Sequence, residues 1–90
     1  MSYQWTITVL DNRPADIVGP STATMTPEEI MNHPERVFFQ MRDADRELQA
    51  MGYFIGEWDS EDGFGPLDDY GVSIGCVDIE YQIDKKWILL

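Results

Sequence analysis

The residues that could do chemistry in this sequence are carboxylates, and several of them alternate along the chain. Glu57, Asp59 and Glu61 occupy every second position, and Asp78 and Glu80 repeat this spacing. In an extended strand such side chains project from one face about 6.6 Å apart. Rows of this kind approach the charge density of a nucleic-acid strand, whose phosphates recur about every 3.4 Å. The chemistry they favour is recognition of Lys and Arg through charge-assisted hydrogen bonds.

The acidic charge is concentrated in one part of the chain. The 90 residues include 17 Asp and Glu against 6 Lys and Arg, and the formal net charge is −11. Residues 47–84 contain ten acidic residues and no Lys or Arg. Direct binding to DNA, RNA or anionic lipid is disfavoured, because basic side chains hold those partners. A face that only aids solubility is the plain alternative. However, ten like charges in one segment repel each other and oppose folding, and solubility alone needs fewer.

The candidate partner-binding residues come from this acidic segment. Phe64 lies between two glycines and is the candidate for an apolar anchor at an interface. Trp58 and Tyr70 border the acidic residues and are expected to close the core at the strand ends. The complete set of candidates is Glu57, Asp59, Glu61, Asp62, Phe64, Asp68, Asp69, Asp78 and Glu80.

Patterns for catalysis and metal binding are weak. His33 is the single histidine, and its position before Pro34 indicates a helix boundary. Cys76 has no basic neighbour in sequence to lower its pKa, which predicts a buried, inert thiol. A calcium loop aligned on Gly63 would require Trp58 as its first ligand, so the match fails. We expect a protein that is not an enzyme, with no catalytic residues, no metal and no cofactor.

The first half of the chain predicts a strand and two helices. Apolar and polar residues alternate from Tyr3 to Val9, which is typical of a half-buried strand and not of a signal sequence. Residues 15–25 are expected to form an irregular connection. Thr26 starts a capping box that predicts a short helix over 27–32.

A long amphipathic helix is expected after Pro34. Apolar residues recur at steps of four and three and form one stripe, and Gly52 follows as the expected terminal residue. Phe39 falls opposite this stripe, where it either packs under the 15–25 connection or is an exposed contact residue. The stripe consists of Val37, Met41, Ala44, Leu48 and Met51.

The last third of the chain is β in character. We expect a strand over 53–58, an acidic loop over 59–69, a strand region over 70–83 with a bulge near Gly75 and Cys76, and a last strand over 87–90. Residues 77–90 are either a hairpin or one long bent strand. The prediction is a single α+β domain over 1–90. Its antiparallel sheet of about four strands, in the chain order β-α-α-β-β-β, packs on the long helix and carries the carboxylates on its other face.

Compartment and function follow from charge and cysteine content. A lone cysteine indicates a reducing compartment, the cytoplasm, and no apolar run is long enough to span a membrane. The expected partner is a basic protein, such as a nucleic-acid-binding enzyme or complex, with no direct nucleic-acid contact. In composition only, the chain is similar to the phage-encoded anti-restriction and anti-CRISPR proteins, many of which are small, acidic and single-domain.

The leading hypothesis is therefore a small acidic inhibitor, encoded by a phage or mobile element, that blocks a nucleic-acid site by charge mimicry. One alternative is an immunity protein or antitoxin that neutralises a basic toxin through aromatic anchors. Another is a structural or assembly interaction module whose acidic face stays in water. The identity of the target and the oligomeric state stay open.

Overall fold

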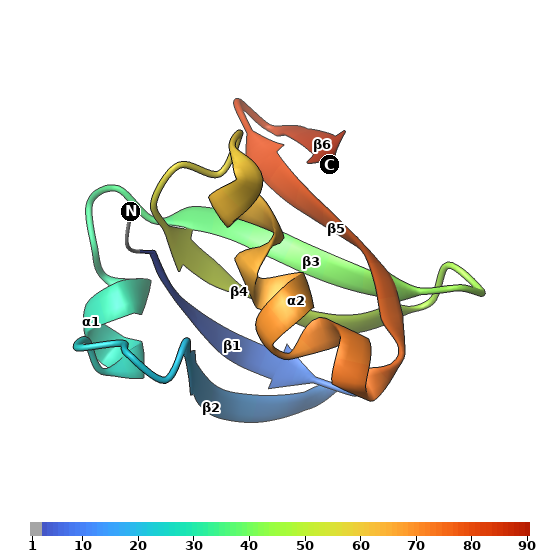
Figure 1. Ribbon diagram of the computed structural model, residues 1–90, viewed down its shortest axis with the longest axis horizontal. Coiled ribbons are helices and arrows are strands. Elements are labelled where there is room, and N and C mark those ends of the chain that lie inside the picture. Colours follow the sequence, from blue (N-terminus) through green and yellow to red (C-terminus); the bar gives the residue numbers. More distant parts are fainter. Residues whose placement is uncertain (1–2) are drawn as a thin grey trace.

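A six-stranded antiparallel sheet forms the centre of the protein, as the computed structural model of residues 3–90 shows (Figure 1). The strand order across the sheet is β2-β1-β4-β3-β5-β6. The predicted α+β domain, with about four strands packed on a long helix, is therefore wrong. The strands are β1 (Gln4–Leu10), β2 (Arg13–Gly19), β3 (Val37–Asp43), β4 (Leu48–Ile55), β5 (Cys76–Ile83) and β6 (Lys86–Leu89).

The segment predicted as the long helix is the β3–β4 hairpin. Five of its apolar residues fit a helical stripe, but Val37, Phe39 and Met41 alternate as in a strand, and the aromatic residues at 38 and 39 favour a strand. Phe39, Met41, Ala50 and Phe54 all point into the core and are buried. Phe39 is thus neither under the 15–25 connection nor exposed. Gly52 allows close strand packing, because a Cβ there would lie 1.9 Å from the carbonyl oxygen of Thr6.

The first strand is confirmed, but much of the predicted irregular connection over 15–25 is strand β2. Asp11 and Asn12 have φ values of 51° and 62° and form a two-residue turn of the type that joins antiparallel strands. Pro14 lacks an N–H donor, which an edge strand tolerates. A two-residue turn and an edge strand therefore replace the first part of the predicted irregular connection.

The short helix α1 (Pro27–Met31) confirms the predicted helix start. The Thr26 hydroxyl accepts a hydrogen bond from the Glu29 N–H at 3.2 Å, and the Glu29 carboxylate accepts one from the Thr26 N–H at 2.8 Å. These two bonds are the capping box that the sequence predicted. Among residues 3–90, no helix has the length and apolar character needed to cross a membrane.

Short helices between β4 and β5 cover one face of the sheet (Figure 1). They are η1 (Glu61–Phe64), a 3₁₀ helix; α2 (Gly65–Asp69); and η2 (Gly71–Ile74), a second 3₁₀ helix. The acidic loop predicted over 59–69 is therefore largely helical, β4 ends at Ile55, and the strand expected from residue 70 begins at Cys76. The predicted bulge near Gly75 and Cys76 is confirmed at the start of β5, where Cys76 and Asp78 pair with the consecutive residues Asp43 and Arg42. Gly75, with φ 88°, ends η2 just before it.

The C-terminal segment is a hairpin and not one bent strand. Asp84 and Lys85 have φ values of 52° and 68° and form a two-residue turn between β5 and β6. The main core lies between the sheet and the covering helices. Its buried residues are Trp5, Ile7, Phe39, Met41, Ala50, Phe54, Leu67, Cys76, Ile79 and Tyr81.

Asp43 holds the turn between β3 and β4. Its carboxylate accepts hydrogen bonds from the backbone N–H of Glu47 and of Asp45, both at 2.9 Å, and from the Gln49 side chain at 2.8 Å. These bonds, that from Glu47 most of all, lower the pKa of Asp43 below its ordinary value of 3.8. The ionised carboxylate is therefore the form that stabilises this turn.

We predict that Asp43→Asn removes a pH-dependent part of the stability. A carboxyl group with a lowered folded-state pKa stabilises the fold above its unfolded pKa, and this contribution is lost as the pH falls through the folded pKa. The free energy of unfolding, measured by chemical denaturation, should therefore differ between wild type and Asp43→Asn near neutral pH. The difference should shrink below about pH 4. A difference that stays constant with pH would contradict this role.

Candidate functional site

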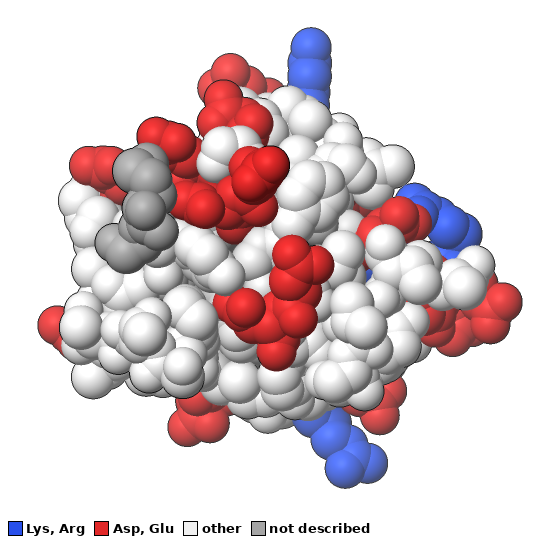
Figure 2. Space-filling model, viewed as in Figure 1, with Lys and Arg blue, Asp and Glu red and all other residues white. Residues whose placement is uncertain are grey.

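Six carboxylates of the segment that covers the sheet form a surface that we call the acidic layer. Their side chains are exposed, except that of Asp62, which is half-buried. Figure 2 shows acidic atoms over η1 and α2, and the basic atoms visible in this view lie at its rim. No Lys or Arg occurs between residues 47 and 84. The acidic layer consists of Glu57, Asp59, Glu61, Asp62, Asp68 and Asp69.

Local hydrogen bonds shape the start of the acidic layer. The Ser60 hydroxyl donates to the Glu57 carbonyl at 2.8 Å and accepts from the Asp62 N–H at 3.2 Å, which caps η1. Pro66 then lies in the first turn of α2, where a missing N–H costs nothing. The segment therefore turns away from the line of β4 after Ile55. The strand-like row of Glu57, Asp59 and Glu61 that the sequence suggested does not form.

Asp69 fastens the far end of the acidic layer to β1. One oxygen of its carboxylate accepts a hydrogen bond from the Tyr3 hydroxyl at 2.8 Å and another from the Trp5 indole Nε1–H at 3.0 Å. Trp5 is only 2% exposed, so its N–H would be left without a partner if Asp69 were removed. Sequence reasoning gave Asp69 only a partner-binding role, because nothing in the sequence connects it with residues more than sixty positions away.

A second attachment lies under η1. The buried Tyr81 hydroxyl donates to the Gly63 carbonyl at 2.7 Å. Gly63 also lies close to the turn before η1, since a Cβ there would come within 1.9 Å of the Trp58 carbonyl oxygen. The Tyr81 hydrogen bond attaches η1 to the sheet, and the bonds to Asp69 attach α2 to it.

Three carboxylates of the acidic layer act together on the Tyr3 hydroxyl. Burial and the hydrogen bond to Asp69 raise the pKa of the Tyr3 hydroxyl, and the negative charges of Asp69, Asp62 and Asp68 raise it further. Charges from η1 and α2 thus combine at one point on the surface. A cationic group that approaches this region would experience their summed attraction.

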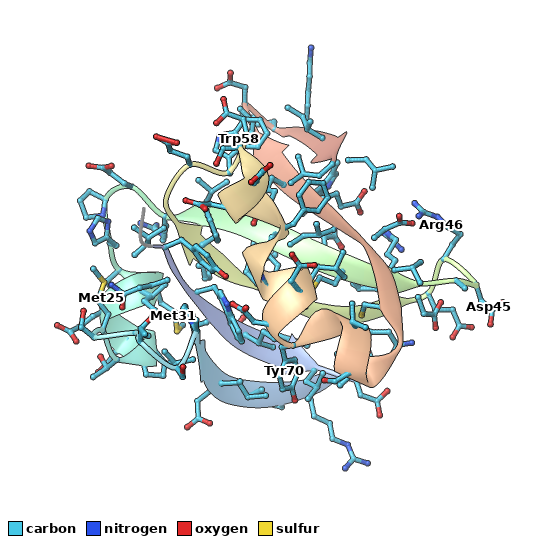
Figure 3. All side chains as sticks on the ribbon, in the orientation of Figure 1. Met25, Met31, Asp45, Arg46, Trp58 and Tyr70 are labelled. Carbon is cyan, nitrogen blue, oxygen red and sulfur yellow. The ribbon has the colours of Figure 1, made fainter. Side chains whose placement is uncertain are left out.

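Asp78 and Glu80 lie outside the acidic layer, although the sequence grouped them with it. Both are on β5 and point away from the covered face, since the alternate residues Ile79 and Tyr81 are buried in the core. Glu80 accepts a hydrogen bond from Arg42 Nε at 3.0 Å, and Asp78 forms an ion pair with Arg46. Figure 3 shows Arg46 near the tip of the β3–β4 hairpin, away from Trp58 and Tyr70. These two carboxylates therefore already have cationic partners.

The three aromatic residues of this region have different roles. Trp58 and Tyr70 are partly buried and pack against the core, as expected. The Trp58 and Tyr81 rings are 5.9 Å apart between centroids. Phe64 remains 38% exposed in η1, with acidic residues on both sides along the chain. It is an exposed apolar side chain between the carboxylates of the acidic layer, where a partner could contact it.

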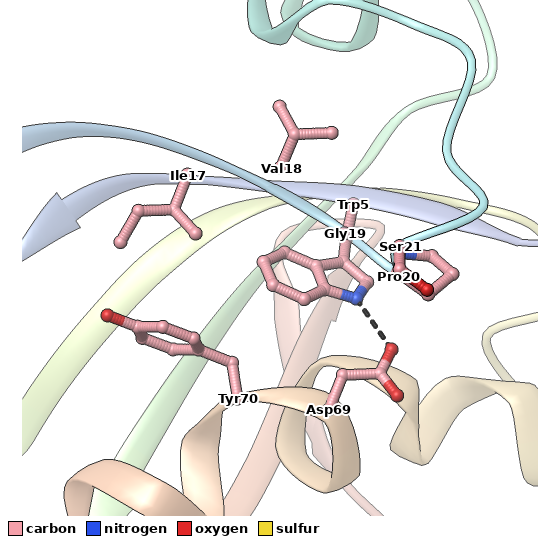
Figure 4. Close-up of a pocket in the computed structure, with 8 residues that line it drawn as sticks. All are labelled: Trp5, Ile17, Val18, Gly19, Pro20, Ser21, Asp69 and Tyr70. Atoms are coloured by element: carbon pink, nitrogen blue, oxygen red, sulfur yellow. Dashed lines mark hydrogen bonds between the residues drawn. The ribbon is translucent and has the colours of Figure 1, made fainter.

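A shallow hollow of about 430 Å³ adjoins the acidic layer (Figure 4). Tyr70 and Asp69 line one side, and Gly19, Pro20 and Ser21 line another. The Trp5 ring lies between them, with its centroid 6.1 Å from that of Tyr70. Trp5 is almost fully buried, and its hydrogen-bond partner Asp69 lines the hollow, so the hollow belongs to the attachment described above.

The residues considered for catalysis have structural surroundings. His33 Nδ1 accepts a hydrogen bond from the Glu35 N–H at 3.1 Å, which stabilises the chain after α1. Burial, together with the charge of Asp43, raises the pKa of the Cys76 thiol to about 11. The thiol is thus protonated at neutral pH and buried, as predicted. Within residues 3–90, no group of three or more His, Cys, Asp or Glu side chains is placed to hold a metal ion.

Comparisons with protein families, with curated proteins and with solved structures gave no match to this chain. Functional inference therefore depends on the chemistry of the acidic layer itself.

We predict that Asp69→Ala lowers the free energy of unfolding by about 1–3 kcal/mol, because it removes a charged acceptor and leaves the Trp5 N–H unsatisfied. Asp68→Ala is the matched control: it removes the same charge from an exposed neighbour. Denaturant unfolding followed by tryptophan fluorescence would measure both. Equal effects of the two substitutions would show that charge, and not the attachment to β1, determines the result.

Proposed function

We propose that this protein is a small acidic inhibitor that binds a basic nucleic-acid-handling protein and blocks its nucleic-acid site by charge mimicry. The observation that carries the proposal is the acidic layer: six carboxylates on one rigidly attached surface, with no Lys or Arg in the surrounding segment. Such an inhibitor is of the anti-restriction or anti-CRISPR type. The proposal assigns the protein to the cytoplasm, where such targets act, and to a phage or mobile element.

The way the layer is built supports mimicry over a purely solvating role. Glu61, Asp62, Asp68 and Asp69 are on short helices fixed to the sheet at Gly63 and Asp69, and Glu57 and Asp59 lie in the hydrogen-bonded turn just before η1, so their positions are set before a partner arrives. A preorganised surface loses less conformational entropy on binding than a flexible acidic tail. Exposed carboxylates can then accept charge-assisted hydrogen bonds from Lys and Arg side chains that would otherwise hold phosphates.

Charge also determines how the complex would form. A net charge of −11 attracts a basic protein over a distance of about one Debye length and raises the association rate. Asp78 and Glu80 contribute less to this attraction, because Arg46 and Arg42 neutralise them. The proposed contact residues are therefore those of the acidic layer together with Phe64.

The exposed Phe64 favours a second candidate, an immunity protein or antitoxin that neutralises a basic toxin. An aromatic anchor in a partner pocket would carry much of such an interface. The two functions differ in their response to salt. A mimic should lose affinity steeply as salt increases, whereas an anchored interface should lose association rate more than affinity.

We predict that reversing Glu57, Asp59 and Glu61 together to Lys abolishes capture of the basic target from a lysate of the host. These side chains are exposed, so the fold should survive, as circular dichroism would show. The matched control reverses Asp16, Glu35 and Glu47, which are also exposed and change the net charge equally. The control should still capture the target. Equal capture by both variants would overturn mimicry through the acidic layer.

A further inference from the structure

The two edges of the sheet differ in how they are protected. The edge strand β2 carries Pro14, which has no N–H, and the exposed Asp16, and both features discourage pairing with another strand. The opposite edge strand, β6, has the sequence Lys-Trp-Ile-Leu and no such residue at its centre. No strand within residues 3–90 pairs with its outer side, which Figure 1 shows at the end of the sheet.

The side chains of β6 are unusually apolar for an edge. Trp87, Ile88 and Leu89 are 39%, 37% and 53% exposed. Trp87 packs against Phe38, whose ring centroid is 5.6 Å away on the face of the sheet opposite η1, α2 and η2. An exposed apolar edge strand is a template for pairing with an extended segment.

We propose that the outer edge of β6 is a self-association surface that pairs antiparallel with β6 of a second copy of this chain. The pairing of β6 with β5 determines which backbone groups of β6 are available to a second copy. Ile83 and Lys86 flank the two-residue turn and pair with each other, so the N–H and C=O groups of Lys86 and Ile88 point toward β5. Those of Trp87 and Leu89 therefore point outward.

One register satisfies all the outward groups. If Ile88 lies opposite Ile88 of the second copy, Trp87 pairs with Leu89 in both directions, which gives four backbone hydrogen bonds. The same register places the exposed Trp87 and Leu89 side chains against each other on one face of the joined sheet. The apolar run is thus complementary to itself about a two-fold axis through Ile88, as an interface between identical copies requires.

Local charge is mixed at this edge, with two lysines at the start of β6 and acidic η1 beside Leu90 at its end. Each copy has a net charge of −11, so two copies repel through most approaches. Near β6, however, Lys85 and Lys86 lie beside Asp84, and the carboxylates of β5 are paired with Arg42 and Arg46. The long-range repulsion that remains should be weakened by salt. Salt should therefore strengthen self-association, whereas it should weaken binding to a basic partner.

Sedimentation equilibrium of the purified chain, from low micromolar to millimolar concentration at low and high salt, tests the proposal. We expect a reversible dimer that is tighter at high salt. Leu89→Pro removes only an outward N–H and should weaken the dimer by about tenfold or more while β5–β6 pairing survives. Leu89→Lys should weaken it as well, because it places a charge in the apolar strip.

Val72→Lys is the matched control, because it changes an exposed valine to lysine on η2, away from β6. It should leave the dimer unchanged. A purified chain that stays monomeric at high salt would overturn the proposal. It would do so also if the β6 edge were found to bind a segment of another protein instead of a second copy. The proposal would also be overturned if both Leu89 variants dimerised with the same affinity as wild type. Neither result bears on mimicry, whose test depends on the acidic layer alone.

Discussion

The bonds from Asp69 to Tyr3 and Trp5 are the interaction on which the rest of the surface depends. They connect the end of α2 to the first strand, across more than sixty residues of chain. With the Tyr81 bond to Gly63, they keep the short helices on the sheet, and the helices in turn cover the core. A single carboxylate therefore contributes both to the charge of the surface and to its rigid attachment.

This arrangement explains how an acidic segment can fold without basic neighbours. Repulsion among the carboxylates opposes folding, and interspersed lysines would have reduced it. The aromatic core beneath the layer offsets part of this cost: Phe54 and Tyr81 pack edge to face with ring centroids 5.4 Å apart. Because this repulsion lowers the stability of the fold, a role for the carboxylates in binding would explain why the segment carries them.

Local signals in the sequence predicted only part of the fold. The Thr26 capping box was predicted because its hydrogen bonds span three residues. The prediction of a long helix was wrong because Val37 and Met41 are four residues apart, a spacing that satisfies both a helical and a strand period, and the apolar Phe39 lies between them. Tertiary pairing with β1 and β5 determined the outcome. Six of the carboxylates that the sequence suggested lie on the segment covering the sheet, but the sequence did not separate Glu80 from them, because strand pairing gave Glu80 an arginine partner that no local pattern indicates.

The central claim is that the acidic layer occupies the site where a basic partner holds nucleic acid. It is tested most directly by competition, with the captured target bound to a labelled duplex and titrated with the chain while anisotropy is followed. Mimicry predicts complete displacement of the duplex, with an apparent affinity that falls in proportion to the duplex concentration. A complex that contains target, duplex and chain together would contradict it.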